Sequence, residues 1–188
     1  GFVVGNVEDK MGIRSAQVSD MHLNDVRVPA ENMIAKPGEG FKLAMKTLDG
    51  GRIGVAAQGL GIAKGAFEVA RKYMMERQQF GKPICKQQYL AFKMAELQTK
   101  IEAAELLLFK AAVAKEEGKP YSVPAAMAKL TCTNVAMEVA TEAVQMLGGN
   151  GYMKGYHVER MLRDAKITQI YEGTNEIQKL VISGPIFR

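Results

Sequence analysis

The stretch Leu90-Ala91-Phe92-Lys93-Met94-Ala95-Glu96-Leu97-Gln98-Thr99-Lys100-Ile101 decides the fold of this chain. Its apolar side chains recur at steps of three and four residues, and its charged side chains fall on the opposite side. The apolar stripe continues through Ala104, Leu108 and Ala111. This spacing predicts an amphipathic helix over about 87–117, and Gly118-Lys119-Pro120 ends it.

The same period extends over most of the remaining chain. It predicts further helices over about 52–77, 123–147, 158–165 and from 175 to the end, with helical character starting at Phe41. Short turns rich in Gly and Pro separate these segments. Long amphipathic helices joined by short turns favour a mainly α fold, an antiparallel four-helix bundle of the three long helices and the C-terminal one.

The first third of the chain has the features of β structure. Runs of alternating or β-branched residues at 1–7, 16–23 and 25–28 predict short strands, and 32–40 is typical of a loop. The chain starts within a strand-like run that has no initiating Met. We therefore expect it to be cut inside a domain.

The composition indicates a globular protein with a sizeable core. Of the 188 residues, 47% are hydrophobic and 24% are charged, which is too apolar for a disordered chain. The net charge of +5 is spread without a long Lys/Arg run, so nucleic acid is not an expected partner. Cys85 and Cys132 are isolated, so we expect neither a disulfide framework nor a metal site, and a reducing compartment. No signal-peptide pattern and no membrane-spanning run is found in the sequence.

One carboxylate stands out near the C-terminus, in Gln169-Ile170-Tyr171-Glu172-Gly173-Thr174-Asn175-Glu176-Ile177-Gln178. Glu172 directly precedes a Gly-Thr-Asn turn that leads into an apolar-periodic tail. Such an acid is either a first-turn charge favoured by the helix dipole or a positioned general base. Spacing alone favours the first of these interpretations.

Two other segments leave two interpretations each, and a third has one. Gln145-Met146-Leu147-Gly148-Gly149-Asn150-Gly151 is favoured as a helix C-cap, although its glycines could also approach a phosphate. Arg77 and Phe80 could bind a phosphate and a ring, or form an ordinary charged helix end. Asp49-Gly50-Gly51-Arg52 is interpreted as a capping signal at the entrance to the first long helix.

Taken in order, these segments resemble the acyl-CoA dehydrogenase family. They are Asp49-Gly50-Gly51-Arg52, the run 76–84, the run 145–152 and the run 163–176, and their order and spacing make the resemblance specific. The likeness covers essentially the whole chain and is greatest to the short-chain, butyryl-CoA branch. It implies that 1–35 is the C-terminal part of a middle β domain and that 36–188 is the C-terminal helical bundle domain.

The resemblance also implies a reaction. Glu172 would remove the α-proton of a short-chain acyl-CoA thioester, and a hydride would pass from the β-carbon to FAD to give a trans-2-enoyl-CoA. The developing enolate charge needs stabilisation. In the family this comes from a ribityl hydroxyl of FAD and from the backbone N–H of the base, here Glu172. Some members carry the base on the first long helix, but Gly61-Ile62 offers no rival acid.

The family's binding residues carry over to matching positions. Those that would contact the FAD of a neighbouring subunit are Arg77, Phe80, Gln88, Gln145, Met146, Leu147, Gly148 and Gly149. Those that would contact the FAD of the same subunit are Thr174, Asn175 and Glu176. Those that would bind acyl-CoA are Asp49, Gly50, Gly51, Arg52 and Gly173. The resemblance implies a homo-oligomer, a dimer or tetramer, that passes electrons to an electron-transferring flavoprotein.

Other interpretations remain open. The chain by itself could be an inactive helical oligomerisation module that keeps half-sites for FAD, and we expect it alone to hold little flavin and show no activity. The parent could also be a branched-chain acyl-CoA dehydrogenase. The expected location is the bacterial cytoplasm, or the mitochondrial matrix if the source is eukaryotic.

Overall fold

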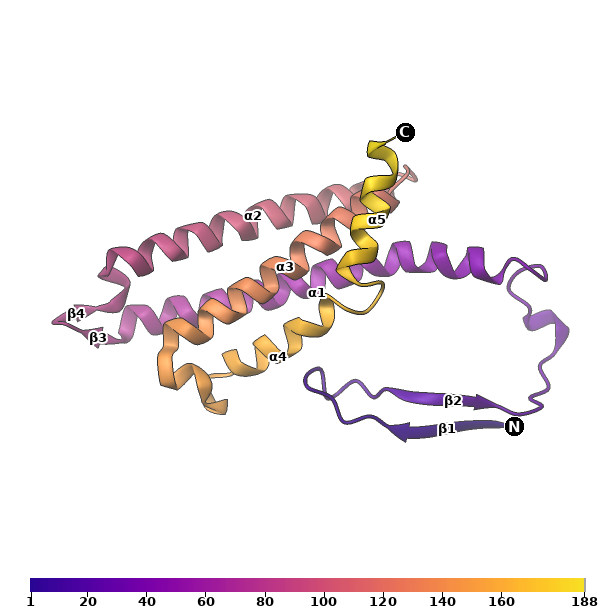
Figure 1. Ribbon diagram of the computed structural model, residues 1–188, viewed down its shortest axis with the longest axis horizontal. Coiled ribbons are helices and arrows are strands. Elements are labelled where there is room, and N and C mark those ends of the chain that lie inside the picture. The colour runs from indigo at the N-terminus through magenta and orange to yellow at the C-terminus, as the bar shows by residue number, and fades with distance from the viewer. Residues whose placement is uncertain (188) are drawn as a thin grey trace.

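The fold is a bundle of long helices, seen in a computed structural model that describes residues 1–187. Helices α1 (Gly40–Glu76), α2 (Gln88–Glu116) and α3 (Ser122–Leu147) run side by side, and α4 (Val158–Thr168) packs along α1 and α3 (Figure 1). The mainly α, bundled architecture expected from the sequence is confirmed. The short turns that the Gly and Pro residues predicted separate the helices.

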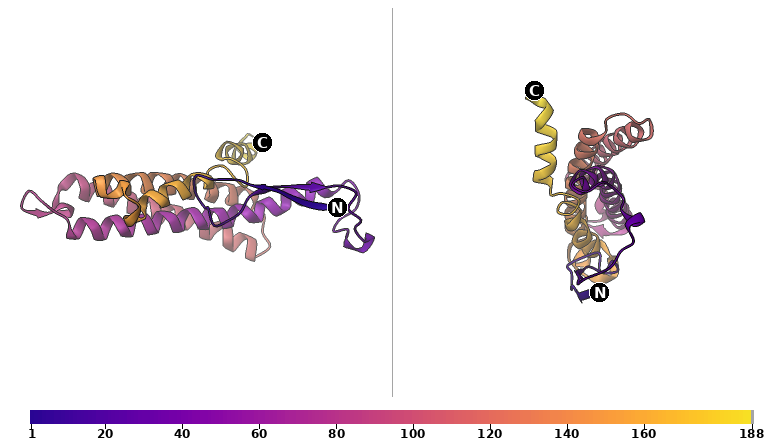
Figure 2. Two further views of the ribbon diagram at one scale, coloured as in Figure 1. Left: turned by 90° about the horizontal axis from the view of Figure 1, so that it is seen from below. Right: turned by 90° about the vertical axis from the view of Figure 1, so that its right-hand side faces the viewer.

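The fourth helix of the bundle is α4 and not the C-terminal one. Helix α5 (Asn175–Ile186) contacts α3 only through its first part and rises out of the bundle (Figure 2). The apolar side chains of Ile177, Leu180 and Ile186 are accordingly exposed. The amphipathic period of α5 predicted a helix correctly, but the surface against which its apolar face packs lies outside this bundle.

Close packing of α1 against α3 depends on small residues. Ala56, Ala63 and Ala66 on α1 are fully buried. A Cβ added at Gly59 would lie only 3.3 Å from the carbonyl oxygen of Cys132 on α3. The two backbones therefore approach each other where side chains are smallest, and this contact fixes the position of both helices.

Helix α1 begins earlier than the sequence predicted. It starts at Gly40, so Asp49-Gly50-Gly51-Arg52 lies inside the helix and does not cap its entrance. The capping interpretation of Asp49 was therefore wrong. Glycine costs about 1 kcal/mol in a helix interior, and the helix nevertheless continues through both glycines because α3 and the segment after α4 pack beside it.

The strands form two small hairpins. β1 (Phe2–Val7) pairs antiparallel with β2 (Ser19–Leu23), and β3 (Gln78–Gln79) pairs with β4 (Lys82–Pro83). The strand expected at 25–28 is not formed, because Asp25 has a φ of 50° and turns the chain away from β1. Short 3-10 turns occur at Ala30–Asn32, Ile84–Lys86, Gly148–Tyr152 and Lys154–Tyr156.

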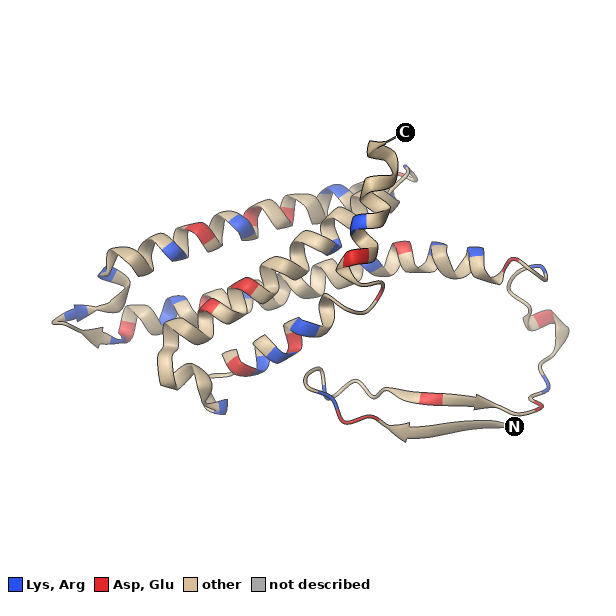
Figure 3. Cartoon of the chain, viewed as in Figure 1, with Lys and Arg blue, Asp and Glu red and all other residues tan. Residues whose placement is uncertain are grey.

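Basic and acidic side chains alternate along the helices rather than gathering by sign (Figure 3). Several form ion pairs within one helix, such as Arg71 with Glu68 and Arg163 with Glu159. Within 1–187, no helix is long and apolar enough to cross a membrane. Cys85 and Cys132 are both free thiols.

Candidate active site

Glu172 lies on the turn that joins α4 to α5, in an unusual backbone conformation. Its φ is 54°, in the left-handed region that side chains other than Gly seldom adopt, and Gly173 follows at 86°. Thr174 is the N-cap of α5, where its hydroxyl accepts from the N–H of Ile177 at 3.5 Å, and Glu176 is the acid of the first turn. Glu172 thus lies outside the first turn of α5, and its position there needs another explanation.

The carboxylate of Glu172 faces helix α1 at Gly51. A Cβ added at Gly51 would lie 2.9 Å from the carboxyl carbon of Glu172 and would collide with one of its oxygens. The α1 position next to the carboxylate is therefore Gly51, not Gly61-Ile62 as the sequence suggested. Gly51 carries no acid, so Glu172 has no competing carboxylate at that position.

Glu172 and Gly51 line one end of a large cavity with a volume of about 1010 Å³. The rest of its wall comes from the segment before α1 and from the first turns of that helix. Its apolar lining residues include Met33, Ile34, Leu43, Ala44 and Leu48. This places a single carboxylate at the edge of a mainly apolar cavity, where it could contact the apolar part of a bound substrate.

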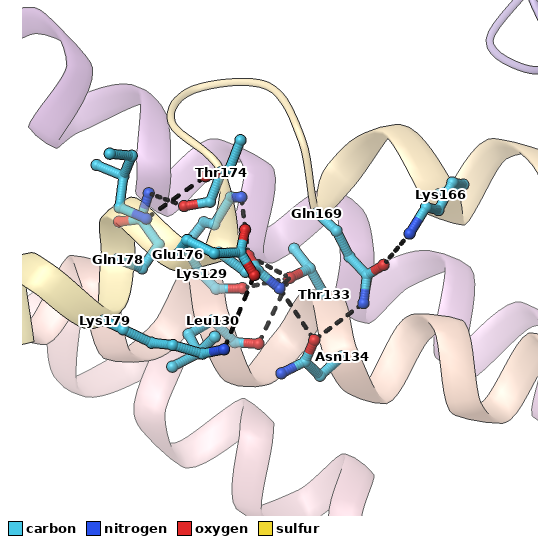
Figure 4. Close-up of polar contacts among 12 residues, drawn as sticks. Lys129, Leu130, Thr133, Asn134, Lys166, Gln169, Thr174, Glu176, Gln178 and Lys179 are labelled. Carbon is cyan, nitrogen blue, oxygen red and sulfur yellow. Dashed lines mark hydrogen bonds and ion pairs between the residues drawn. The ribbon is translucent and has the colours of Figure 1, made fainter.

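The turn that carries Glu172 rests on a buried polar network (Figure 4). Lys129 of α3 is fully buried, and its Nζ donates to the carbonyl of Gly173 at 2.9 Å and to Oδ1 of Asn175 at 3.0 Å. Gln178 of α5 is also fully buried, and its Nε2 donates to the same Gly173 carbonyl at 2.8 Å. These contacts fix the backbone immediately after Glu172.

Asn175 joins that network to α3. Its Nδ2 donates to the hydroxyl of Thr133 at 3.1 Å and to Oδ1 of Asn134 at 2.9 Å. Sequence reasoning missed both Lys129 and Gln178. The available signal for Lys129 was a charged residue within the apolar run Ala125-Ala126-Met127-Ala128, on a helix that the sequence predicted to be part of the core.

Burial lowers the pKa of Lys129 from 10.5 to about 8. The carboxylates of Glu176 and Glu172 favour its charged form, whereas Arg52 opposes it. Among residues 1–187, no carboxylate lies within 4.0 Å of its Nζ. Lys129 is thus a buried cation that is satisfied by carbonyl oxygens rather than by a salt bridge.

The residues that were expected to bind substrate separate into two groups. Gly51 lines the cavity and Gly173 belongs to the turn of the base. Asp49 instead accepts from Arg52 at 2.5 Å and from Ser122 at 3.0 Å, and Gly50 faces Lys115. The substrate-binding role of Asp49, Gly50 and Arg52 stays a prediction.

The residues that were expected to bind FAD also form two groups. The first lines a cavity of about 350 Å³ beyond the C-terminal ends of α1 and α3, and its expected members are Arg77, Gln145, Met146, Leu147, Gly148 and Gly149. Phe80 is 91% exposed at the tip of the β3–β4 hairpin, and Gln88 is exposed at the start of α2. The second group, Thr174, Asn175 and Glu176, lines a cavity of about 170 Å³ with Lys166 and Lys179.

These two groups line separate cavities along α3. Asn134 lines the cavity of the second group, whereas Gln145 lines the cavity of the first. These two positions of α3 are roughly 17 Å apart at about 1.5 Å per residue of helix. The structure therefore divides the expected FAD residues between two cavities.

Residues 38–186 match the family model described as the C-terminal domain of acyl-CoA dehydrogenase. The chain is 61% identical over all 188 residues to a short-chain specific acyl-CoA dehydrogenase from Clostridium acetobutylicum, of which it covers 50%. The chain spans about half the length of the curated relatives it matches.

Solved structures agree with this match. Butyryl-CoA dehydrogenase from Megasphaera elsdenii superposes with a TM-score of 0.99 at 57% identity, with 100% of this chain and 49% of that one covered. A chain in a structure described as the electron transferring flavoprotein of Acidaminococcus fermentans has a TM-score of 0.98 at 56% identity, with 100% of this chain and 50% of that one covered.

Proposed function

Because the chain belongs to the acyl-CoA dehydrogenase family, we propose that it is the C-terminal half of a FAD-dependent short-chain acyl-CoA dehydrogenase. The observation that supports this most directly is the position of the Glu172 carboxylate at the edge of an apolar cavity. The turn that carries it is fixed by hydrogen bonds from Lys129 and Gln178 to the carbonyl of Gly173. A base that must reach one carbon atom of a bound substrate needs such a fixed position.

In the proposed reaction Glu172 takes the α-proton of the acyl thioester. The apolar side chains of the cavity would hold the acyl chain and keep water from the carboxylate. No intramolecular hydrogen bond from the backbone N–H of Glu172 is found in 1–187, so this N–H can donate to the thioester oxygen as negative charge develops there. When bound, FAD supplies the acceptor for the hydride.

The chain's own residues fit a flavin dinucleotide in two parts. Gly148 and Gly149 have open space where a Cβ would be, so their backbone is accessible to a phosphate, and the guanidinium of Arg77 lines the same cavity. Thr174, Asn175 and Glu176 would contact the flavin that lies beside Glu172. Because the two groups line separate cavities, we propose that two copies of the chain share each flavin.

The large exposed surface supports this oligomer. The described residues expose 12236 Å², whereas a compact monomer of this mass exposes roughly 8900 Å². Exposed apolar side chains on α2 and α5 include Tyr89, Phe92, Phe109, Leu180 and Ile186. We propose that other subunits and the upstream half cover these surfaces, in a dimer or tetramer.

The proposed electron acceptor is an electron-transferring flavoprotein. Its support is the similarity to a chain in a structure described by that name. The bacterial origin of the similar proteins from Clostridium acetobutylicum and Megasphaera elsdenii supports a bacterial cytoplasmic location for the whole protein. For the chain taken alone, the divided FAD residues support a second candidate, an inactive oligomerisation module.

The test is Glu172→Gln in the full-length protein. A general base contributes about 100- to 10,000-fold to a rate, so we expect butyryl-CoA oxidation to fall by that factor while the visible flavin absorbance stays unchanged. Glu102→Gln, at an exposed position on α2, is the matched control and should retain activity. Near-normal turnover of the Glu172 variant would exclude Glu172 as the base.

A further inference from the structure

The turn that carries Glu172 is held by two buried donors with different charges. The Nε2 of Gln178 approaches the carbonyl oxygens of Glu172, Gly173 and Thr174 at 3.4, 2.8 and 3.4 Å. The Nζ of Lys129 approaches the Gly173 carbonyl from α3 at 2.9 Å. One carbonyl thus accepts from a neutral amide and from a cation, both fully buried.

The backbone needs this support because its conformation is strained. Glu172 has a side chain at a φ of 54°, and such conformations persist only where surrounding contacts determine them. A hydrogen bond from a charged donor is stronger than one from a neutral donor. Lys129 is therefore the stronger of the two contacts that hold Glu172 in place.

We propose that Lys129 is a positioning residue for proton abstraction, which fixes the turn of Glu172 through a charged hydrogen bond to the carbonyl of Gly173. This inference rests on the proposed function, in which Glu172 is the base. Lys129 does not line the cavity, and it reaches the turn of Glu172 through the carbonyl of Gly173.

Its charge distinguishes Lys129 from Gln178. The charged neighbours of Lys129 are Glu172 on the turn, Glu176 on α5 and Arg52 on α1, and its Nζ contacts the turn of the base. A hydrogen bond from a charged donor is roughly twice as strong as one from a neutral donor. Loss of Lys129 should therefore lower kcat more than loss of Gln178 does, with little change in the KM for butyryl-CoA in either variant.

The experiment compares Lys129→Met and Gln178→Met in the full-length protein. Each replacement has a similar length and removes one donor to the Gly173 carbonyl, but only the first removes a charge. Lys72→Met, at an exposed position on α1, is the surface control. The measurements are kcat and KM for butyryl-CoA, thermal melting, and hydrogen exchange of the peptide that spans 169–178.

We expect kcat to fall about 10- to 100-fold in both site variants, since small displacements of a reacting group have effects of this size. The fall should be larger in Lys129→Met than in Gln178→Met, and the KM for butyryl-CoA should change little in either variant. Exchange of the 169–178 peptide should become faster in both variants and stay unchanged in Lys72→Met.

A Lys129 variant with unchanged exchange in 169–178 would overturn the positioning role, whether or not the protein has dehydrogenase activity. A fall in kcat that is no larger for Lys129→Met than for Gln178→Met would overturn the role of the charge. The proposed function fails separately, if the unaltered full-length protein does not oxidise butyryl-CoA. Melting curves show whether either variant is folded, and Gln178→Met tests the turn even if Lys129→Met does not fold.

Discussion

Gly51 allows the carboxylate of Glu172 to lie against helix α1. A methyl group at this position would overlap the carboxylate, which can only move away because the helix backbone is fixed. For Gly51→Ala we expect kcat to fall about 100-fold, the effect of displacing a reacting group by about 1 Å. Steady-state kinetics together with thermal melting measure the change.

Gly54→Ala is the matched control for this prediction. It lies in the next turn of the same helix, and a Cβ there meets open space. Replacing Gly by Ala in a helix interior stabilises it by up to about 1 kcal/mol, so this variant should melt higher and keep its activity. Equal kinetics for the two alanine variants would contradict the proposed contact between Gly51 and Glu172.

The buried charge of Lys129 also predicts how stability depends on pH. Its pKa is about 8 in the folded protein, against 10.5 ordinarily. Between these values the unfolded chain binds more protons, so the contribution of Lys129 to the free energy of unfolding rises with pH. This contribution is fully present above 10.5 and is lost as the pH falls through 8.

Urea unfolding of the unaltered protein and of Lys129→Met, from about pH 7 to about pH 10.5, measures this effect. The free energy of unfolding of the unaltered protein should rise with pH relative to that of Lys129→Met. Burial raises the pKa values of Tyr171 and Cys132, which act in the opposite direction but equally in both proteins. A difference that does not vary with pH would contradict the prediction.

At the scale of single residues, the sequence led to Glu172 but not to Lys129. Glu172 is marked by its neighbours in the chain, and the companion segments gave it a role. Lys129 meets Gly173 across 44 positions of sequence, and nothing local distinguishes it from an exposed lysine on a helix. A local pattern cannot show which side of α3 is covered by a turn that forms much later in the chain.

At the scale of elements, the sequence predicted α2 and α3 nearly to their ends. Their apolar stripes are regular, and Gly118 and Gly148, both at positive φ, end them clearly. The start of α1 and the segment 25–28 were wrong. Gly50-Gly51 has the composition of a helix start, and the sequence does not show that tertiary packing overrides this local propensity. The alternating residues at 25–28 have no partner strand within residues 1–187.

The contact between the β1–β2 hairpin and α4 depends on one small residue. A Cβ at Gly12 would lie 2.6 Å from the carbonyl oxygen of Arg163, which is backbone and cannot move aside easily. On either side, Arg163 donates to the carbonyl of Met11 at 2.7 Å, and the N–H of Ile13 donates to Asp164 at 2.7 Å. The loop is therefore held against α4 from both sides of Gly12.

We expect Gly12→Ala to destabilise this contact by about 1–3 kcal/mol, the usual range for an overpacked site. Hydrogen exchange of residues 8–18 should become faster, because both flanking hydrogen bonds would lengthen. Gly155→Ala is the control, since a Cβ there meets open space. Unchanged hydrogen exchange in the hairpin loop would show that α4 moves to accommodate the added methyl group.

At the scale of the whole molecule, the sequence predicted a helical bundle but not its fourth member. The apolar period of α5 resembles that of a helix packed within the bundle, yet α5 stands away from it (Figure 2). The same limit applies to the FAD residues, whose order in the sequence did not show that they line two separate cavities. Both features depend on surfaces beyond one copy of the chain.

The β1–β2 hairpin has a practical consequence for anyone who produces this chain by itself. Phe2, Val4, Met21 and Leu23 are all more than half exposed, and within residues 1–187 the two strands pair only with each other. An uncovered hairpin with free strand edges and apolar faces is a template for aggregation through edge-to-edge pairing. The first 23 residues would thus add a route to aggregation beyond the exposed apolar side chains of α2 and α5.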